Sequence, residues 1–169
     1  YLTGNSNISG SANSLFGWRA GYSSVSASDN SIFGYDAGYN TTGGENVFFG
    51  SYAGNANTAG AKNTFIGRSS GRSNTIGNSN VAVGINALYS NTTISNLVAV
   101  GDSALYYNTA VGNTAVGSKA LFANTTGISK TKTGVRRITF FINNLLIKPL
   151  FILIFFQGTI KQECFILFV

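Results

Sequence analysis

The chain of 169 residues contains no histidine, no methionine, one cysteine and one proline, and only 9% of its residues are charged. Without histidine, the commonest general base and the commonest metal ligand in proteins are both missing. A single cysteine excludes a disulfide scaffold and a cysteine-based metal cluster. The composition therefore predicts that the protein is not an enzyme, with no catalytic residue, no metal site and no cofactor.

The chain opens on Tyr1 and has no starting methionine, which indicates a fragment. The lack of a signal peptide then says nothing about where the protein is found. The length allows one domain with a sizeable buried core.

The formal net charge of +6 is distributed unevenly along the chain. Residues 1–128 carry five basic and four acidic residues, a net charge of +1, whereas residues 129–169 carry six basic and one acidic residue, a net charge of +5. Most of the excess charge thus belongs to the last quarter of the chain. The basic composition is no guide to a partner, and we expect no nucleic-acid binding.

A glycine recurs every 16 or 17 residues, and it marks an internal repeat. The clearest copy reads Asn113-Thr114-Ala115-Val116-Gly117-x-x-Ala120-Leu121, followed by Asn124-Thr125-Thr126-Gly127. Seven copies are clear, and an eighth around Gly134 is decaying. The marker glycines of the seven clear copies are Gly17, Gly34, Gly50, Gly67, Gly84, Gly101 and Gly117.

The repeat unit has the composition of short strands and turns. Its apolar runs are four residues or fewer, rich in Val, Ile, Phe and Thr, and bounded by Gly and Asn. A unit this short cannot bury its own apolar face, so successive copies must stack. The sequence predicts an all-β fold, a parallel β-roll or β-helix of seven to eight coils spanning residues 1–134, with about 4.8 Å between coils and two short strands per unit.

Asparagine and threonine recur at fixed places in the unit. Asparagine stands four residues before most marker glycines, and Leu97 in its place predicts a small bulge or a register adjustment. We expect a second asparagine column to form a hydrogen-bonded ladder. That ladder comprises Asn40, Asn57, Asn74, Asn91, Asn108 and Asn124. A threonine column follows it, comprising Thr41, Thr58, Thr75, Thr92, Thr109 and Thr125.

At two further positions of the repeat, the size of the residue changes along the chain in opposite directions. Two residues before the marker glycine, the residue is large in the first four copies and alanine in the next three. Four residues after the marker, it is glycine in the first four copies and leucine in the next three. Because close-packed interiors conserve volume, we expect these columns to touch inside one coil or between chains.

The Asn-Thr-Ala-Val-Gly-x-x-Ala-Leu and Asn-Thr-Thr-Gly segments resemble the repeats of phage tail-fibre-like proteins and trimeric bacterial surface adhesins. The resemblance covers about residues 1–134. It implies a homotrimer displayed outside the cell, on a bacterial surface or a virion. The function that it implies is structural and adhesive, with attachment to a host-surface glycan or receptor.

The segment 135–169 does not follow the repeat, and three interpretations of this irregular hydrophobic tail remain open. It is the product of a frameshift, a membrane anchor, or a hydrophobic cap over the last coil. Lys148 and Pro149 interrupt its apolar stretch, which disfavours a membrane span. Contact of the tail with a membrane is therefore left undecided.

Two sets of side chains are candidates for function. Asp36 and Glu45 are carboxylates of one unit, and paired carboxylates hydrolyse polysaccharides, although their turn positions favour ordinary solvated charge. Trp18, Tyr35 and Tyr52 follow marker glycines and are candidates for stacking on sugars, although packing between coils or chains is the favoured interpretation. The alternative to a fibre is a soluble solenoid that binds ice or carbohydrate through its threonine, asparagine or aromatic columns.

Overall fold

A computed structural model describes residues 2–134 of the chain. Within this range the chain forms no helix. The interpretations of the tail as a frameshift product, an anchor or a cap fall on residues 135–169, outside the described residues.

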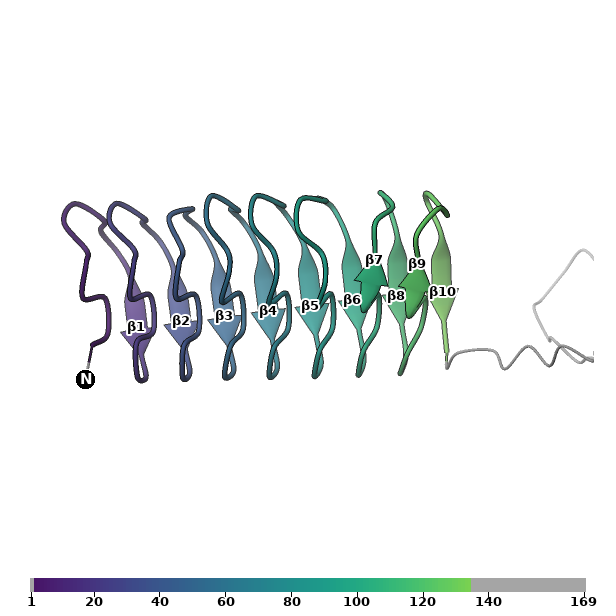
Figure 1. The fold of residues 1–169 in the computed structure, drawn as a ribbon, viewed down its shortest axis with the longest axis horizontal. Helices are drawn as coiled ribbons and strands as arrows, with labels where there is room; N and C mark the ends of the chain where they lie inside the picture. The colour runs from purple at the N-terminus through teal and green to yellow at the C-terminus, as the bar shows by residue number, and fades with distance from the viewer. Residues whose placement is uncertain (1, 135–169) are drawn as a thin grey trace, which may run out of the picture. The chain divides into compact units, whose positions relative to one another are not determined.

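The described chain is a parallel β-solenoid, as the repeat predicts (Figure 1). Each coil contributes one three-residue strand to a single eight-stranded sheet in which every strand pairs with the next in parallel. We name each coil by its strand in this sheet. The strands are β1 (Ser14–Phe16), β2 (Ser31–Phe33), β3 (Val47–Phe49), β4 (Thr64–Ile66), β5 (Val81–Val83), β6 (Val98–Val100), β8 (Thr114–Val116) and β10 (Thr131–Thr133).

The second strand expected in every unit is present in only two coils. β7 (Tyr107–Asn108) and β9 (Ala123–Asn124) pair in parallel on the other side of the solenoid. In the other coils this side is a turn, yet its backbone still bonds from coil to coil, as in the 2.8 Å bond from Ser23 N to Tyr39 O. The expectation of two strands per unit is therefore wrong for most coils, because the turns satisfy their backbone groups without extended geometry.

The marker glycines stand at a corner of each coil, directly after the strand of the large sheet. From Gly17 to Gly117 their φ angles lie between 125° and 140°, a region that side-chain-bearing residues rarely adopt. A Cβ added at any of them would lie 2.5–2.6 Å from the carbonyl oxygen of the next marker glycine. Both the conformation and the close approach of neighbouring coils therefore require glycine here.

The two columns that exchange size, two residues before and four residues after the marker glycine, meet inside each coil. This confirms the expectation of contact within one coil. A Cβ built on Gly54 would lie 2.6 Å from the ring of Phe48 in the same coil, and Gly71 is covered in the same way by Phe65. The two phenyl rings stack with centroids 5.1 Å apart. In the β5 coil the arrangement is reversed, since Leu88 is fully buried in one core cluster with Ala82.

The reversal has a conformational cost. Leu88, Leu105 and Leu121 occupy the place of the earlier glycines, and their φ angles of 53°, 50° and 48° are left-handed. Such a conformation costs roughly 1–2 kcal/mol for a residue with a side chain. Burial of each leucine against the small alanines offsets this cost.

Converting the β4 coil from the first packing type to the second tests this complementarity. Phe65→Ala alone should lower the free energy of unfolding by about 3–5 kcal/mol, and Gly71→Leu alone should also destabilise because Phe65 fills its space. The double variant should recover about 2 kcal/mol or more relative to the sum of the single losses. Urea unfolding of the four proteins measures the coupling, and additive losses would contradict contact between the two columns.

The marker-glycine corner makes a second prediction. Gly50→Ala should lower the free energy of unfolding by more than about 3 kcal/mol, because the added Cβ meets a backbone carbonyl that cannot move without shifting the next coil. Gly112→Ala is the control, since Gly112 has a φ of 67° but its nearest neighbour is the Ser129 hydroxyl at 3.1 Å. We expect a loss of only about 1 kcal/mol there, and equal losses would remove the special role of the marker column.

Candidate functional site

The asparagines that precede the strands of the large sheet form a buried column that hydrogen-bonds one coil to the next. Asn46, Asn63 and Asn80 are fully buried. The Oδ1 atom of Asn63 accepts the backbone N–H of Asn80 at 3.0 Å, and its Nδ2 donates to Gly77 O at 2.8 Å. Leu97 continues this column without the predicted bulge, because β6 stays in register with β5.

The second asparagine column forms a ladder, with one correction and one break. Asn74 donates to Asn57 Oδ1 at 2.7 Å, and Asn91 donates to Asn74 Oδ1 at 3.1 Å. Asn124 donates to Asn108 Oδ1 at 3.2 Å. Between these two runs the Oδ1 atom of Asn91 is buried without a hydrogen-bond partner.

Asn40 does not belong to this ladder. Thr41 occupies the place equivalent to Asn57, since the N–H of Thr41 bonds to Gly38 O as that of Asn57 bonds to Gly54 O. Thr41 is fully buried, whereas Asn40 is half-buried beside it. The β2 coil has 16 residues where most coils have 17, and the residue that it lacks falls between Thr41 and β3. Counting back by 17 from Asn57 therefore gives Asn40, whereas the equivalent residue is Thr41.

The threonine column is shifted by the same residue, so that Thr42 is its first member in place of Thr41. The Oγ1 atom of Thr42 donates to Thr58 O, that of Thr58 to Thr75 O, and that of Thr75 to Thr92 O, at 2.8–3.1 Å. Thr109 repeats the bond to Thr125 O at 2.9 Å. In each of these residues the hydroxyl hydrogen is held by the protein itself.

The glycine and asparagine columns are thus internal, and the candidates for binding are on the surface. The outward face of the large sheet carries one apolar side chain per coil directly before each marker glycine, which we call the apolar ridge. Phe16 is 74% exposed and Phe49 is 58% exposed. The ridge consists of Phe16, Phe33, Phe49, Ile66, Val83, Val100 and Val116.

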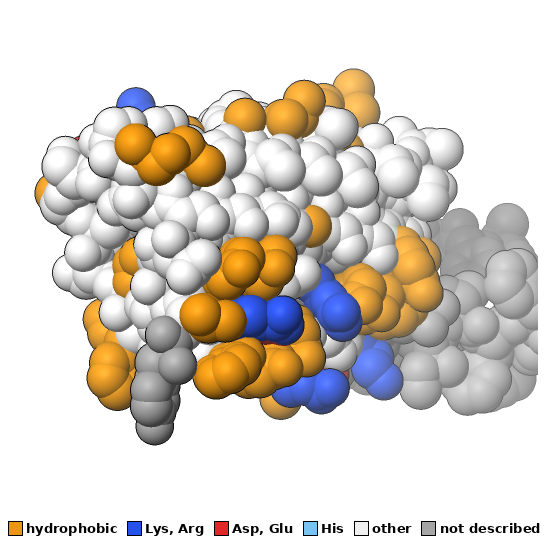
Figure 2. All heavy atoms as spheres, turned by 60° about the vertical axis from the view of Figure 1, so that its left-hand side comes forward, with side chains coloured by type: hydrophobic (Ala, Val, Ile, Leu, Met, Phe, Trp, Pro, Cys, Tyr) orange, Lys and Arg blue, Asp and Glu red, His pale blue; other side chains and the backbone are white. Residues whose placement is uncertain are grey.

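The N-terminal part of the apolar ridge is aromatic and contains an open groove. The ring centroids of Phe16 and Phe33 are 6.4 Å apart, and those of Phe33 and Phe49 are 5.7 Å apart. The groove is lined by these three rings together with Gly34 and Gly50, and its walls are almost wholly apolar. Figure 2 shows one face of the molecule, on which hydrophobic side chains gather together with lysines and arginines.

The three aromatic residues expected to stack on sugars follow the ridge around the next corner. Trp18 is 45% exposed and Tyr35 is 46% exposed, each directly after a marker glycine. Tyr52 stands one place further along its coil and is half-buried. The structure brings Tyr35 and Tyr52 together, edge to face, with centroids 5.4 Å apart.

A surface column that the sequence did not predict runs beside this corner, five residues after each marker glycine. The rings of Tyr22 and Tyr39 stack at 5.0 Å, and those of Tyr89 and Tyr106 stack at 4.8 Å. Burial raises the pKa of Tyr106. The signal was present in the repeat, because five of its seven members are aromatic. This aromatic column comprises Tyr22, Tyr39, Asn55, Arg72, Tyr89, Tyr106 and Phe122.

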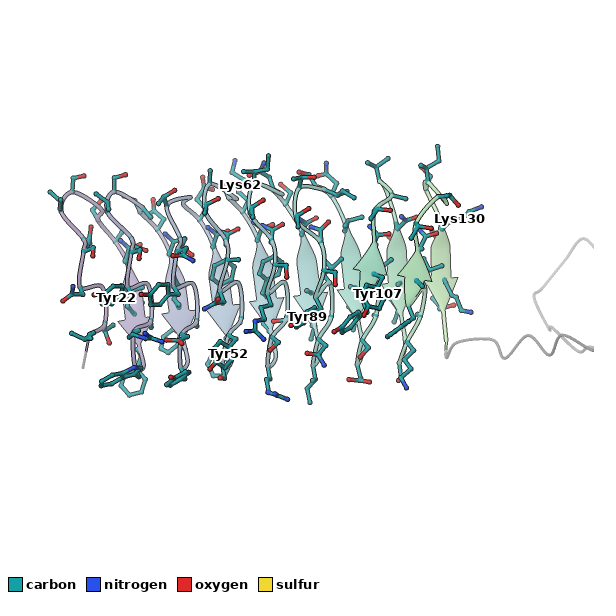
Figure 3. All side chains as sticks on the ribbon, viewed as in Figure 1. Tyr22, Tyr52, Lys62, Tyr89, Tyr107 and Lys130 are labelled. Atoms are coloured by element: carbon teal, nitrogen blue, oxygen red, sulfur yellow. The ribbon has the colours of Figure 1, made fainter. Side chains whose placement is uncertain are left out.

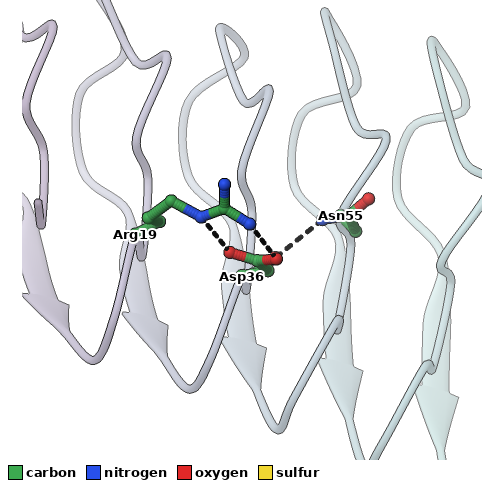
Figure 4. A network of polar contacts seen from close by, with 3 residues as sticks. All are labelled: Arg19, Asp36 and Asn55. Atoms are coloured by element: carbon green, nitrogen blue, oxygen red, sulfur yellow. Dashed lines mark hydrogen bonds and ion pairs between the residues drawn. The ribbon is translucent and has the colours of Figure 1, made fainter.

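Asp36 is held in an ion pair and is not a solvated charge. Its carboxylate accepts two hydrogen bonds from Arg19, at 2.7 Å from Nε and 2.6 Å from Nη2, and only 5% of the residue is exposed (Figure 4). The hydrogen bond to Asp36 raises the pKa of Arg19. Asn55 donates from Nδ2 to the backbone carbonyl of Asp36 at 2.9 Å.

The structure gives the other candidate carboxylate, Glu45, a different partner. The Oε1 atom of Glu45 lies 3.9 Å from Nζ of Lys62. Figure 3 places Lys62 at the opposite end of the coils from Tyr52. Asp36 and Glu45 therefore do not share one set of contacts, and no pairing of the two carboxylates supports hydrolysis. Across residues 2–134, no group of three or more histidine, cysteine, aspartate or glutamate side chains is arranged to hold a metal ion.

No family model, no curated protein and no solved structure matches this chain. The part of the chain that the structure describes contains no helix long and apolar enough to cross a membrane. The solenoid, its apolar ridge and its aromatic column are therefore the features that bear on function.

Proposed function

We propose that the chain is a segment of a trimeric attachment fibre displayed outside the cell, on a bacterial surface or a virion. The observation that carries this proposal is the apolar ridge on the outward face of the large sheet. It runs through seven consecutive coils, and its side chains lie directly above one another because the strands pair in register.

The apolar ridge is unusual for a surface that faces water. A sheet with one solvated face ordinarily alternates apolar residues toward the core and polar residues outward. In β3 all three residues are apolar, with Phe48 buried and both Val47 and Phe49 exposed. A column of apolar side chains that are half-buried or exposed in seven successive coils is typical of a contact with another protein.

A second copy of the chain is the partner that fits such a ridge. The ridge repeats once per coil along the solenoid axis, so an identical solenoid lying alongside meets it with the same spacing. Three copies around one axis close the assembly and bury the ridge of each copy. The result is a rigid shaft in which every coil is bonded to its neighbours.

Attachment follows from the repetition of the surface corners. Each copy presents Trp18, Tyr35 and the aromatic column once, so a trimer presents three identical sets. Shallow sites of modest affinity then act together, since a second contact made by the same particle is effectively intramolecular. We propose no catalytic role.

The second candidate is a solitary solenoid that binds carbohydrate, and the exposed Trp18 and Tyr35 favour it. The ice-binding variant has less support. Four of its threonine hydroxyls donate to backbone carbonyls of the neighbouring coil and have no hydrogen left for an external acceptor. The molar mass in solution separates a fibre from a solitary solenoid.

We expect sedimentation velocity of the full chain to give three times the 17.7 kDa mass of one copy. Phe49→Lys should shift the protein to a monomer, because it places a charge on the apolar ridge while its side chain points away from the core. Ile76→Lys is the matched control, since Ile76 is 53% exposed but lies outside the ridge, and it should leave the trimer intact.

Circular dichroism of both variants should retain the wild-type spectrum. A wild-type monomer at micromolar concentration would contradict the fibre and favour the solitary solenoid. A trimer that survives Phe49→Lys would show that the ridge is not the contact between copies.

A further inference from the structure

Arg72 stands at the centre of the aromatic column, in a place where most coils carry a ring. Its guanidinium carbon lies 4.8 Å from the ring centroid of Tyr52 and 5.8 Å from that of Tyr89. Its Nη1 atom donates to the Tyr89 hydroxyl at 3.3 Å. The planar guanidinium therefore lies between two rings and is held in a fixed position.

The charge of Arg72 has no carboxylate partner among the described residues. The two ion pairs found there join Arg19 to Asp36 and Lys62 to Glu45. Arg19 contacts an aromatic ring as well, that of Tyr39 at 4.9 Å, but its fork is filled by the Asp36 carboxylate. Arg72 also contacts aromatic rings, but its guanidinium group makes only one hydrogen bond there, a long one to the Tyr89 hydroxyl.

A guanidinium held in this way is suited to one class of ligand. Its five N–H donors have a rigid fork geometry that matches the oxygens of a carboxylate or a sulfate. Its position is fixed before binding, so little side-chain freedom is lost when an anion arrives. Arg68, exposed in the same turn, adds a second positive charge.

Aromatic surface continues from Arg72 toward the exposed corner of the solenoid. Tyr52 touches Arg72 on one side and the half-exposed ring of Tyr35 on the other. The contacts thus form an unbroken strip from the β2 coil to the β5 coil: Tyr35, Tyr52, Arg72 and Tyr89. An aromatic ring presents an apolar surface to the C–H face of a sugar, while tyrosine hydroxyls offer hydrogen bonds at its edge.

We infer that this strip binds an acidic saccharide, with its carboxylate or sulfate on Arg72 and its sugar ring against Tyr35 and Tyr52. The inference rests on the proposed attachment function and names the class of glycan that the fibre recognises. Arg72 supplies charge and orientation, and the tyrosines supply stacking area. A neutral sugar has no group that uses the open fork.

The test compares three saccharides that share one neutral core: lactose, sialyllactose with its carboxylate, and lactose sulfate. Affinity is measured by nuclear magnetic resonance titration of the full chain, with acetate and inorganic sulfate as free anions. We expect at least one acidic saccharide to bind ten or more times tighter than lactose and than its free anion. Equal binding of acidic saccharide and lactose would overturn the inference, as would a free anion that binds as well as the saccharide.

Arg72→Tyr is the decisive variant, because it inserts the residue that the aromatic column prefers and removes the positive charge together with the N–H donors that would bind the anion. It should weaken acidic saccharide binding at least tenfold and leave the midpoint of thermal unfolding within about 2 °C of wild type. Lys62→Gln, at the other end of the coil, removes the same charge and should change the affinity less than twofold.

An equal loss of affinity in the two variants would show that only net charge matters, and it would overturn the inference. Unchanged saccharide binding by Arg72→Tyr would overturn it as well. A wild-type trimer that binds no acidic saccharide would overturn the glycan site and leave the fibre proposal standing. A wild-type monomer that binds an acidic saccharide through Arg72 would overturn the fibre proposal and leave the glycan site standing.

Discussion

The close stacking of marker glycines is the constraint on which the rest of the solenoid depends. At each of these corners the carbonyl oxygen of the next coil occupies the space where a Cβ would lie. Neighbouring coils therefore approach as closely as the backbone allows, and the strands on either side pair in register through the whole sheet. Because the strands never slip in register, the strand positions of the repeat form straight columns, whether they point inward to the core or outward to water.

Inward and outward columns change character independently. The core changes from a large residue facing glycine to alanine facing leucine between the β4 and β5 coils, where Phe65 is followed by Ala82. The apolar ridge changes from aromatic to aliphatic one coil earlier, between Phe49 and Ile66. The first change conserves the volume inside a coil, whereas no such need governs the ridge. The chain can thus vary its surface, including the Arg72 strip, independently of the packing type inside the coils.

Much of the fold could be predicted from the sequence, because a 17-residue period of glycine, asparagine and short apolar runs has few physical solutions. The contact between the size-exchange columns could be predicted as well, since it follows from volume alone. Positions next to the 16-residue coils could not. Counting forward from Gly34 gives Thr41 and counting back from Asn57 gives Asn40, and only the backbone hydrogen bonds decide between them. The aromatic column was missed because Arg72 and Asn55 interrupt it, and a guanidinium that replaces a ring in a stack is recognised only from geometry.

Thermal unfolding after deletion of one whole coil tests the stacking account most directly. Removing residues 51–67 joins Gly50 to Arg68, so that Phe48 meets Gly71 in place of Gly54 and the joined coil keeps the first packing type. If each coil contacts only its neighbours, the shortened chain keeps its β-type circular dichroism and melts cooperatively at a slightly lower temperature. Removing only residues 51–58 breaks the register and should abolish the folded state. If the whole-coil deletion unfolds the protein as completely as the half-coil deletion, the account of a register set by stacked glycine corners is wrong.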